Sequence, residues 1–367
     1  MTRAKIRLAG PGDDVSLRAL LRKTPMAGRV SLAFCREPSF FEGERPGALA
    51  TQTICCVDRS DGEIIGFGCR SLRRLYVDGQ PETVGYLGGL RLAPHARGGL
   101  TLARLYRELR VLHEQDAATR FYVTTILSDN VAAREALESG RGNLPRYRPW
   151  GKITTYLVPL SRNRESVAQS DVRRCDRATL TSAHGCLDRW NSRRQFAPVY
   201  GPDDLAGGRL CPGFNLGDLY VRERGSAVIG TLGVWDQTPV KQTVIAGYSA
   251  GLSLVRPLVN LAARLRGHLG LPPVGQEVRA AHASMVSVEG DDPETFKRLL
   301  ETARADWSGR GFSYLALGLA EGSPFAAAAR RLSARSFQSE VYLVHWPDEE
   351  PTFPDGVRPL HLEIATL

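Results

Sequence analysis

The segment from Gly88 to Thr101 contains the residues whose types and spacing could do chemistry. A run with strand character ends at Pro94, and Arg97-Gly98-Gly99 follows directly before an amphipathic helix. A glycine turn in this place leaves backbone N–H groups unpaired at the start of the helix, where the helix dipole also attracts anions. The segment therefore predicts a binding site for a pyrophosphate. The other interpretation is an ordinary strand-to-helix turn with an exposed arginine.

The pair Gly88-Gly89 lies inside the strand that leads to this turn. Glycines within a strand permit a β-bulge, which bends the strand away from its neighbour and leaves backbone groups unpaired. We therefore expect this strand to splay from the next one and to offer main-chain groups to a ligand.

The positive charge of the chain is concentrated in its first half. The formal net charge is +9, and residues 1–165 contain 26 Lys and Arg against 17 Asp and Glu, whereas residues 166–367 contain 22 of each. Because both halves are rich in Arg, the difference in net charge between them is better evidence for a ligand than the Arg content itself. It predicts that the first half meets an anionic partner, for which a nucleic acid and a phosphorylated cofactor are the two candidates.

Hydrophobic periodicity predicts the elements that position these residues. Leu102, Leu105, Leu109 and Leu112 are spaced by three and four residues, which indicates a helix of about 16 residues after the glycine turn. The other elements expected in the first half are strands at 5–8, 51–57, 63–77, 83–92, 121–127 and 153–158, and helices from Asp13 and over 130–138.

The second half repeats this order of elements. The strands expected there start at Val172 and cover 227–230, 285–288, 312–319 and 341–344, with helices over 180–190, 296–307 and 324–332. Residues 252–273 are additional and predict an apolar helix, and residues 358–367 alternate like a last strand. A polar run at 161–170 separates the halves, so we expect two domains, residues 1–163 and residues 171–367. Two unrelated α/β domains could share this order by chance.

The first half resembles the Gcn5-related N-acetyltransferase (GNAT) superfamily, which binds acetyl-CoA between two splayed strands. The resemblance rests on the order strand, Pro94-x-x-Arg97-Gly98-Gly99, helix, strand, Asn130-x-x-Ala133. It covers residues 5–160 by motif and element order, and residues 172–346 by element order only. It implies a fold of the α/β class, with a mixed α+β sheet: two tandem GNAT-like domains, each a twisted mixed sheet flanked by helices.

The resemblance also implies which residues hold the cofactor, acetyl-CoA or another acyl-CoA. The backbone around the turn would hold the pyrophosphate, through Arg97, Gly98, Gly99, Leu100 and Thr101. The strand Leu90-Arg91-Leu92 would line the pantetheine arm, with the Leu92 backbone paired to its amide and the Leu90 N–H facing the thioester oxygen. Asn130 would contact the same arm, and a helix-capping role is an equal alternative for this residue.

The groups that would move protons depart from the family pattern. The family's frequent tyrosine on the helix after Asn130 is replaced by Leu137, so Tyr147 is the nearest general acid. The strand carries no glutamate base, although Glu82 lies just before it. In some tandem members of the superfamily the terminal carboxylate serves as base, which implies a role for Leu367.

Other side chains are weaker candidates for the same chemistry. We expect His95 and His113 at the surface, and Cys55, Cys56 and Cys69 as buried, reduced thiols rather than nucleophiles. The seven cysteines form no C-x-x-C pair, and no tight Cys/His cluster indicates zinc.

The second half lacks the glycine turn. Its corresponding strand leads to the acidic run Glu289–Glu294, which would cap the next helix by itself and repel phosphate. We therefore expect it to bind no CoA, and either to form a wall of the acceptor site or to serve stability alone.

Together these features predict an acyl-CoA-dependent N-acyltransferase, an acetyltransferase by preference, acting on a small-molecule or peptide amine. A GNAT-like protein that binds acyl-CoA without turnover is the alternative. Nucleic-acid binding has no helix-turn-helix, RNP motif or basic-aromatic stripe to support it. Because no run of about 18 apolar residues occurs, we expect no membrane span and a cytoplasmic protein.

Overall fold

The computed structural model describes residues 4–26, 28–97, 100–140, 144–161, 171–265, 270–353 and 358–367. The first half contains β1 (Ala4–Leu8), α1 (Asp14–Lys23), β2 (Val30–Cys35), α2 (Phe40–Gly43), β3 (Ala50–Asp58), β4 (Ile64–Val77), β5 (Gln80–Leu92), α3 (Thr101–Asp116), β6 (Tyr122–Leu127), α4 (Val131–Glu138) and β7 (Arg146–Pro159). The second half contains β8 (Val172–Arg174), α5 (Leu180–Asn191), β9 (Leu219–Arg224), β10 (Ala227–Trp235), β11 (Gln242–Tyr248), α6 (Ala250–Leu265), β12 (Ala280–Val288), α7 (Pro293–Trp307), β13 (Tyr314–Ala320), α8 (Ala326–Leu332), β14 (Arg335–His345) and the short 3-10 turn η7 (Ile364–Thr366).

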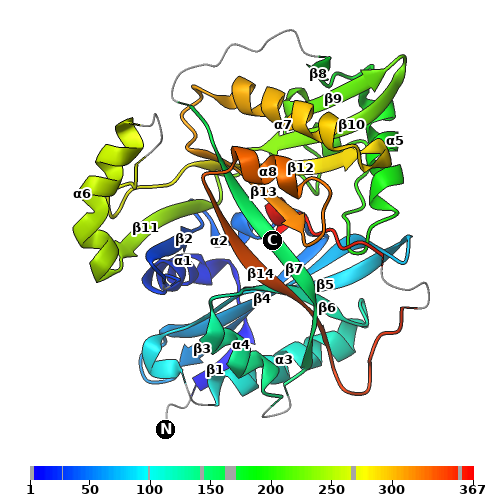
Figure 1. The fold of residues 1–367 in the computed structure, drawn as a ribbon. Coiled ribbons are helices and arrows are strands. Elements are labelled where there is room, and N and C mark those ends of the chain that lie inside the picture. The colour runs from blue at the N-terminus through cyan, green and yellow to red at the C-terminus, as the bar shows by residue number, and fades with distance from the viewer. Residues whose placement is uncertain are drawn as a thin grey trace.

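Both halves contribute to one mixed sheet. Its twelve strands follow the order β1-β3-β4-β5-β6-β14-β7-β13-β12-β10-β9-β8, and helices flank it, as Figure 1 shows. The pair β5/β6 and the pair β12/β13 are parallel, at corresponding places in the two halves. The mixed α/β architecture expected from the sequence is confirmed.

Each half contributes a strand that pairs with strands of the other half. β14, near the end of the chain, lies between β6 and β7 of the first half. β7 in turn pairs with β13 of the second half, from Tyr314 opposite Pro159 to Ala320 opposite Ile153. The segments predicted as separate domains therefore share a continuous hydrogen-bonded ladder.

The two faces of the first-half sheet carry different side chains, because successive residues of a strand point to opposite faces. Arg70 of β4 is 1% exposed and makes a two-armed ion pair with Asp116 of α3, at 2.6 and 2.9 Å. Cys69 and Arg73 on the same strand therefore point away from α3. We call their side the α1/α2 face, since Phe67 packs there in one core cluster with Leu17 and Phe40.

The expected last strand at 358–367 is wrong. In the structure Leu360 makes only an isolated bridge to Gln195, and η7 follows. The alternation of Leu360, Leu362 and Ile364 reflects packing against the core cluster around Leu75, Val341 and Leu343 instead. Apolar alternation specifies which side chains are buried, but a strand also needs a partner edge for its backbone.

The additional segment of the second half forms a separate layer. β11 pairs with β2 in a two-stranded ribbon, and α6 follows it at one side of the molecule (Figure 1). Leu254, Leu258 and Leu261 of α6 are 82%, 68% and 56% exposed. Within the described residues, no helix combines the length and the hydropathy that crossing a membrane requires.

Candidate active site

The sheet opens between β5 and β6. These parallel strands pair only at Gly85 with Tyr122 and at Tyr86 with Val123, and no later pair occurs among the described residues. β5 nevertheless stays paired with β4 as far as Leu92, and β6 stays paired with β14 as far as Leu127. The two strands therefore diverge toward their carboxyl ends, and the expected splay is present.

A bulge in β5 lies in the diverging part. Cys69 pairs with Gly88 and Phe67 pairs with Arg91, so Gly89 and Leu90 together face the single residue Gly68. Gly89 has a φ of +65°, which L side chains rarely adopt, and it is exposed. The bulge predicted for this glycine pair is thus confirmed, and it turns the main chain at the opening.

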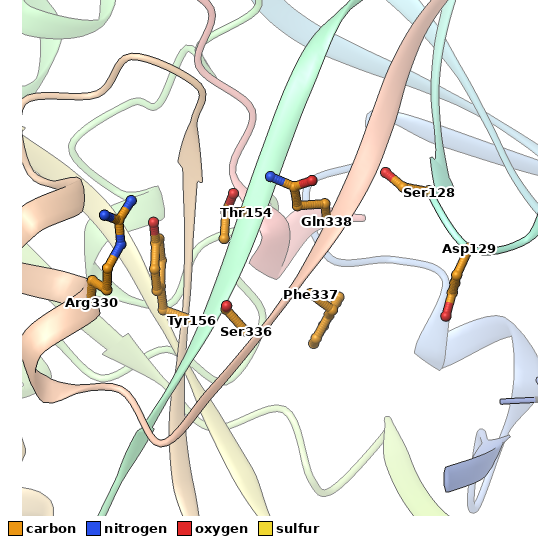
Figure 2. A pocket seen from close by; sticks show the side chains of 8 residues that line it. All are labelled: Ser128, Asp129, Thr154, Tyr156, Arg330, Ser336, Phe337 and Gln338. Carbon is orange, nitrogen blue, oxygen red and sulfur yellow. The ribbon is translucent and has the colours of Figure 1, made fainter. Parts of the chain in front are cut away.

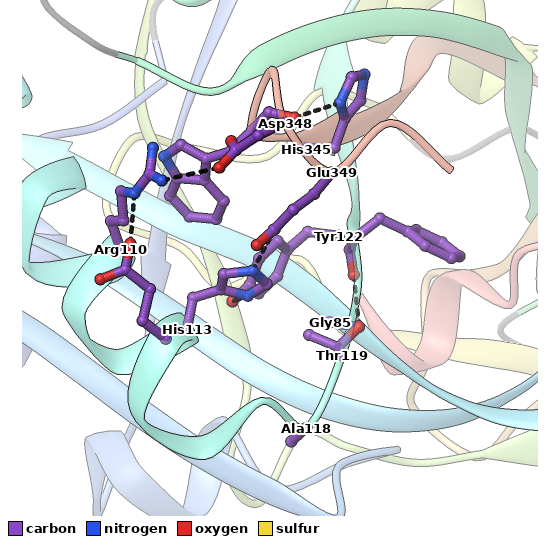
Figure 3. A network of polar contacts seen from close by, with 12 residues as sticks. Gly85, Arg110, His113, Ala118, Thr119, Tyr122, His345, Asp348 and Glu349 are labelled. Carbon is purple, nitrogen blue, oxygen red and sulfur yellow. Dashed lines mark hydrogen bonds and ion pairs between the residues drawn. The ribbon is translucent and has the colours of Figure 1, made fainter. Parts of the chain in front are cut away.

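A polar network holds the closed end of β5 and β6 together (Figure 3). The Gly85 N–H donates to Thr119 Oγ1 at 3.0 Å, just before β6. His113 of α3 is 5% exposed, with Nδ1 3.0 Å from the Tyr122 hydroxyl and Nε2 2.5 Å from the Glu349 carboxylate. The surface position expected for His113 is therefore wrong, because this histidine ties α3 to β6 and to the segment after β14.

The helix expected after the glycine turn is α3, and its start carries no side-chain cap. The first helical residue is Thr101, and its N-cap Leu100 is 65% exposed and provides no capping side chain. Arg97 is exposed, and its Nε donates to the Leu92 carbonyl at 3.2 Å. Gly98 and Gly99 lie outside the described residues.

The corresponding helix of the second half is capped by its own sequence. Asp292 accepts from the N–H groups of Glu294 and Thr295 at 3.3 and 3.0 Å at the start of α7. A helix end whose N–H groups are satisfied by a carboxylate has little affinity for a phosphate. The capping of α7 by its own acidic residues, expected from the sequence, is confirmed, and the absence of CoA binding by the second half stays a prediction.

An ionic cluster lies on the α1/α2 face, beside the bulge. It consists of Arg36, Glu44, Arg73, Arg91 and Lys241. Arg36 Nε is 3.1 Å from Glu44 Oε1, and the two side chains are 15% and 20% exposed. Although burial acts in the other direction, Arg36 and Lys241 hold the pKa of the Glu44 carboxyl below its usual value.

Cys69 connects this cluster to the bulge. A Cβ atom on Gly89 would lie 3.1 Å from Cys69 Sγ, so the thiol touches the bulged backbone. Burial raises the pKa of the Cys69 thiol well above its usual value, and the nearby Glu44 carboxylate adds to the effect. The thiol is thus kept protonated, and the cluster and the bulge form one site.

Lys241 is the titratable group of this site with the most unusual setting. Burial and the charge of Arg36 lower the pKa of the Lys241 ammonium to about 7. Its Nζ donates to the main-chain oxygen of Leu367 at 3.1 Å. A lysine with such a pKa exchanges protons near neutral pH, which an ordinary surface lysine does not.

Contacts from the second half hold the C-terminal segment in place. Glu363 is 4% exposed, and its carboxylate accepts from the Tyr200 hydroxyl at 2.8 Å and from the Met285 N–H at 2.9 Å. Gln237 Nε2 donates to the Ala365 carbonyl at 2.7 Å. Figure 1 places this segment in the middle of the molecule, so Leu367 is brought to Lys241 by the tertiary structure.

Tyr147 lies away from the opening. It pairs with Val344, which pairs with Tyr122 at the closed end of β5 and β6. Its hydroxyl is hydrogen-bonded to the Tyr106 hydroxyl of α3, and burial raises the pKa of Tyr147 well above its usual value. Tyr147 therefore belongs to the α3 face, on the opposite side of the sheet from the ionic cluster.

We accordingly expect Tyr147→Phe to reduce stability rather than turnover. Loss of the buried hydroxyl pair would lower the free energy of unfolding by about 1 kcal/mol, measured by urea unfolding, with kcat unchanged. Tyr106→Phe is the matched control, and the double variant should lose little more, because both changes remove the same hydrogen bond. A tenfold fall in kcat at unchanged stability would instead support the acid role expected from the sequence.

Glu82 and Asn130 are also separated from the ionic cluster. Glu82 lies near the start of β5, opposite Leu75, where it makes an ion pair with Arg120 at 3.4 Å. Asn130 caps α4, with its side chain accepting from the Ala133 N–H at 3.3 Å. The capping interpretation of Asn130 is therefore realised, and its contact with a pantetheine arm stays a prediction.

A cavity of about 420 Å³ lies beside Asp129, the residue before Asn130. It lies between the end of β6, β14, β7 and α8 (Figure 2), and it is lined by Ser128, Asp129, Thr154, Tyr156, Arg330, Ser336, Phe337 and Gln338. Ser336 and Gln338 alternate with Phe337 along β14, so these two share the sheet face of Glu340, which lies 3.9 Å from Arg134 of α4. Ser336 and Gln338 thus reach the cavity from the sheet face that carries α4.

The thiols have the environment of core residues. All seven cysteines are free and buried. Burial raises the pKa of the Cys55 thiol to about 11 and raises that of Cys56. Since the thiolate is the nucleophile, these cysteines are suited to packing. Among the described residues no group of three or more His, Cys, Asp or Glu side chains could hold a metal ion.

Comparison with solved structures identifies the fold. N-myristoyltransferase of Saccharomyces cerevisiae with bound myristoyl-CoA superposes with a TM-score of 0.64 and 10% identity, over 99% of this chain and 86% of that one. A GCN5-related N-acetyltransferase of Sphaerobacter thermophilus superposes with a TM-score of 0.56 and 13% identity, over 100% and 99% of the two chains. The chain has the GNAT fold. No family model and no curated protein sequence matches it.

A third GNAT structure covers a smaller share of its protein. It is the GCN5-related glucosamine N-acetyltransferase region of a fungal β-N-acetylglucosaminidase, with a TM-score of 0.56 and 13% identity over 94% of this chain and 38% of that one. The GNAT fold expected from the sequence is thus confirmed, and the similarity spans both halves.

Sequence reasoning missed the ionic cluster. Arg36, Glu44 and Lys241 lie in segments without a recognisable motif, and Lys241 is more than 190 residues from the other two. The one signal in the sequence is that Lys241 is among only five lysines in a chain with 43 arginines. The rarity of lysine marks all five lysines equally, so it does not indicate which of them belongs to the site.

Proposed function

We propose that this protein is an acyl-CoA-dependent N-acyltransferase, which transfers an acyl group directly from the thioester to an amine. The observation that carries the proposal is the opening between β5 and β6 with the bulge at Gly89. An extended amide-containing ligand fits such an opening, because it can pair with β5 as a missing strand would. Pantetheine, the arm of CoA, is a ligand of this kind.

The start of α3 would bind the pyrophosphate of the donor. Leu100 and Thr101 provide N–H groups that no side chain of the described residues caps, and Arg97 adds a positive charge nearby. Leu90, Arg91 and Leu92 would line the pantetheine arm. We take acetyl-CoA as the first donor to test, and a longer acyl-CoA as the second, since one similar structure holds myristoyl-CoA.

The bulge would stabilise the charge that develops during the reaction. The amine nitrogen attacks the thioester carbonyl carbon, a C–N bond forms, the C–S bond breaks, and CoA leaves as the thiolate. The carbonyl oxygen carries negative charge in the transition state, and main-chain N–H groups at Gly89 and Leu90 are suited to stabilise it. The bulge exposes the backbone at this place.

Lys241 would accept the proton that the amine releases. With its pKa lowered to about 7, the lysine loses its proton more readily than an ordinary lysine, and a neutral amine is a competent base. Its contact with the main-chain oxygen of Leu367 orients the Nζ atom. Leu367, which the resemblance implies in proton transfer, would thus act together with Lys241.

We expect one CoA per chain, bound by the first half. Arg97→Glu combined with Gly98→Asp should abolish CoA binding, because the two new carboxylates would repel the pyrophosphate and occupy the helix N-terminus. Asp292→Asn is the matched control at the start of α7, and it should leave CoA binding unchanged. Isothermal calorimetry measures both, and two CoA per chain would contradict the assignment.

Catalysis is distinguished from acyl-CoA binding without turnover by CoA release. The purified protein with acetyl-CoA is incubated with pools of amines, and free CoA thiol is measured with a thiol reagent. Release that depends on both an amine pool and the intact Arg97 turn supports the proposal. Tight acyl-CoA binding without release for any pool favours the non-catalytic alternative.

A further inference from the structure

The ionic cluster holds more positive than negative groups. Arg36 is paired with Glu44, and Lys241 donates to Leu367. Arg73 and Arg91 remain, and neither has a carboxylate partner among the described residues. A buried guanidinium without an anion is costly, so a site with this composition favours an anionic ligand.

Arg73 is the more buried of the two guanidinium groups. It is 6% exposed, its Nε donates to Ser71 Oγ at 3.2 Å, and its Cζ lies 4.2 Å from the centroid of the Tyr86 ring. Its Nη1 is buried and has no hydrogen-bond partner among the described residues. Burial lowers the pKa of the Arg73 guanidinium.

Arg91 is less enclosed than Arg73 and lies on β5, the strand that would line the acyl-CoA. Its Nη1 donates to the Leu90 carbonyl at 2.8 Å, within the bulged strand. Its Cζ lies 6.0 Å from the Phe34 ring. This arginine is partly exposed and follows the bulge, and its Nε is buried without a hydrogen-bond partner among the described residues.

Arg73 lies between the opening and the C-terminal turn. A Cβ atom on Gly47 would lie 3.5 Å from Arg73 Nη1 and 2.5 Å from Thr366 Cβ, so the guanidinium is beside η7. The Tyr86 ring under Arg73 reaches β6, with its hydroxyl 3.2 Å from Thr125 Oγ1. A group held by Nη1 would thus be close both to the diverging strands and to the segment that ends at the Lys241 contact.

We propose that Arg73 binds a carboxylate carried by the acceptor, so that the acceptor is an amine with an acidic group, such as an amino acid. This inference rests on the proposed N-acyltransferase activity. The acceptor amine has to approach Lys241 and the bulge, while its carboxylate completes the hydrogen bonds of the Arg73 guanidinium. Acceptors without the acidic group would leave that guanidinium unpaired.

The experiment compares amino acids with their amides as acceptors. Glycine is paired with glycinamide, and alanine with alaninamide, so that each pair differs in the carboxylate while the amine is retained. We measure kcat/KM from CoA release for the unaltered protein, for Arg73→Met and for Arg74→Met. Arg74 is the matched control, because it is the next residue of β4 and is exposed.

For the unaltered protein, kcat/KM for the better amino acid should exceed kcat/KM for its amide by at least about tenfold. Arg73→Met should remove this preference by lowering kcat/KM for the amino acid alone, and Arg74→Met should retain it. Equal use of acid and amide, or an equal loss for both in Arg73→Met, would overturn the proposal. So would a loss specific to succinyl-CoA as donor, because the carboxylate at Arg73 would then belong to the acyl group.

A binding measurement separates this inference from the proposed function. Calorimetry of the same amino acids and amides in the presence of CoA requires no turnover. Binding of an amino acid that is at least about tenfold tighter than that of its amide, and weakened by Arg73→Met, supports the carboxylate site even where no CoA release is found. Release for amides alone would leave the activity intact and reject the site. Acyl-CoA binding is measured for Arg73→Met and for the conservative variant Arg73→Lys as a control that both variants are folded.

Discussion

Lys241→Met is expected to lower kcat/KM by about 10²-fold to 10⁴-fold while acyl-CoA binding stays unchanged. The substitution keeps the apolar stem of the side chain and removes the group that would accept the proton. Lys241→Arg should be similarly inactive, because a guanidinium stays protonated at every accessible pH. Lys152→Met is the matched control, since Lys152 on β7 is 42% exposed and lies near Glu340.

The pH dependence of the reaction also tests the role of Lys241 as base. A loss of stability alone would not change the shape of the pH profile. Lys241 accepts a proton only when it is neutral, and the neutral fraction grows as the pH rises through its pKa. For the unaltered protein kcat, which reports groups of the bound complex, should therefore rise as the pH passes through the pKa of Lys241, about 7. This rise with pH, the acidic limb of the profile, should be absent from the residual activity of Lys241→Met. Full activity of this variant, or an unchanged limb, would remove Lys241 from the mechanism.

The fragment of residues 1–165 is expected to have no stable fold. Without the second half, β6 loses β14, with which it pairs from Leu127 opposite Ser339 to Tyr122 opposite Val344. β7 loses partners on both sides, since it lies between β14 and β13. The edges exposed in this way are long and apolar, which favours aggregation.

Complementation is the positive control for this prediction. Residues 166–367 refolded together with residues 1–165 should restore acyl-CoA binding and a cooperative thermal transition, because each fragment holds a strand that the other lacks. Circular dichroism and size-exclusion chromatography measure the outcome. A monomeric fragment of residues 1–165 with full CoA binding and a cooperative transition would show that the halves are independent domains after all.

The sequence by itself determined the local parts of the site. The spacing of Leu105, Leu109 and Leu112 specified the face of α3, and these three leucines are buried together. The pair Gly88-Gly89 predicted the bulge, because a positive φ within a strand is accessible to glycine and rarely to other residues. Both features depend on neighbouring residues only, so a short window of sequence contains the information.

Only the tertiary structure decided which distant segments meet. β14 lies between β6 and β7, which are more than 150 residues earlier in the chain. No local pattern in the sequence identifies these strands as its partners. Tyr147 followed the expected order along the chain, but its register placed it at the closed end, on the α3 face. Arg73, Glu44 and Lys241 meet for the same reason. Charged residues are compatible with many surface positions, so their burial in one cluster is set by the packing of both halves rather than by their own sequence neighbourhood.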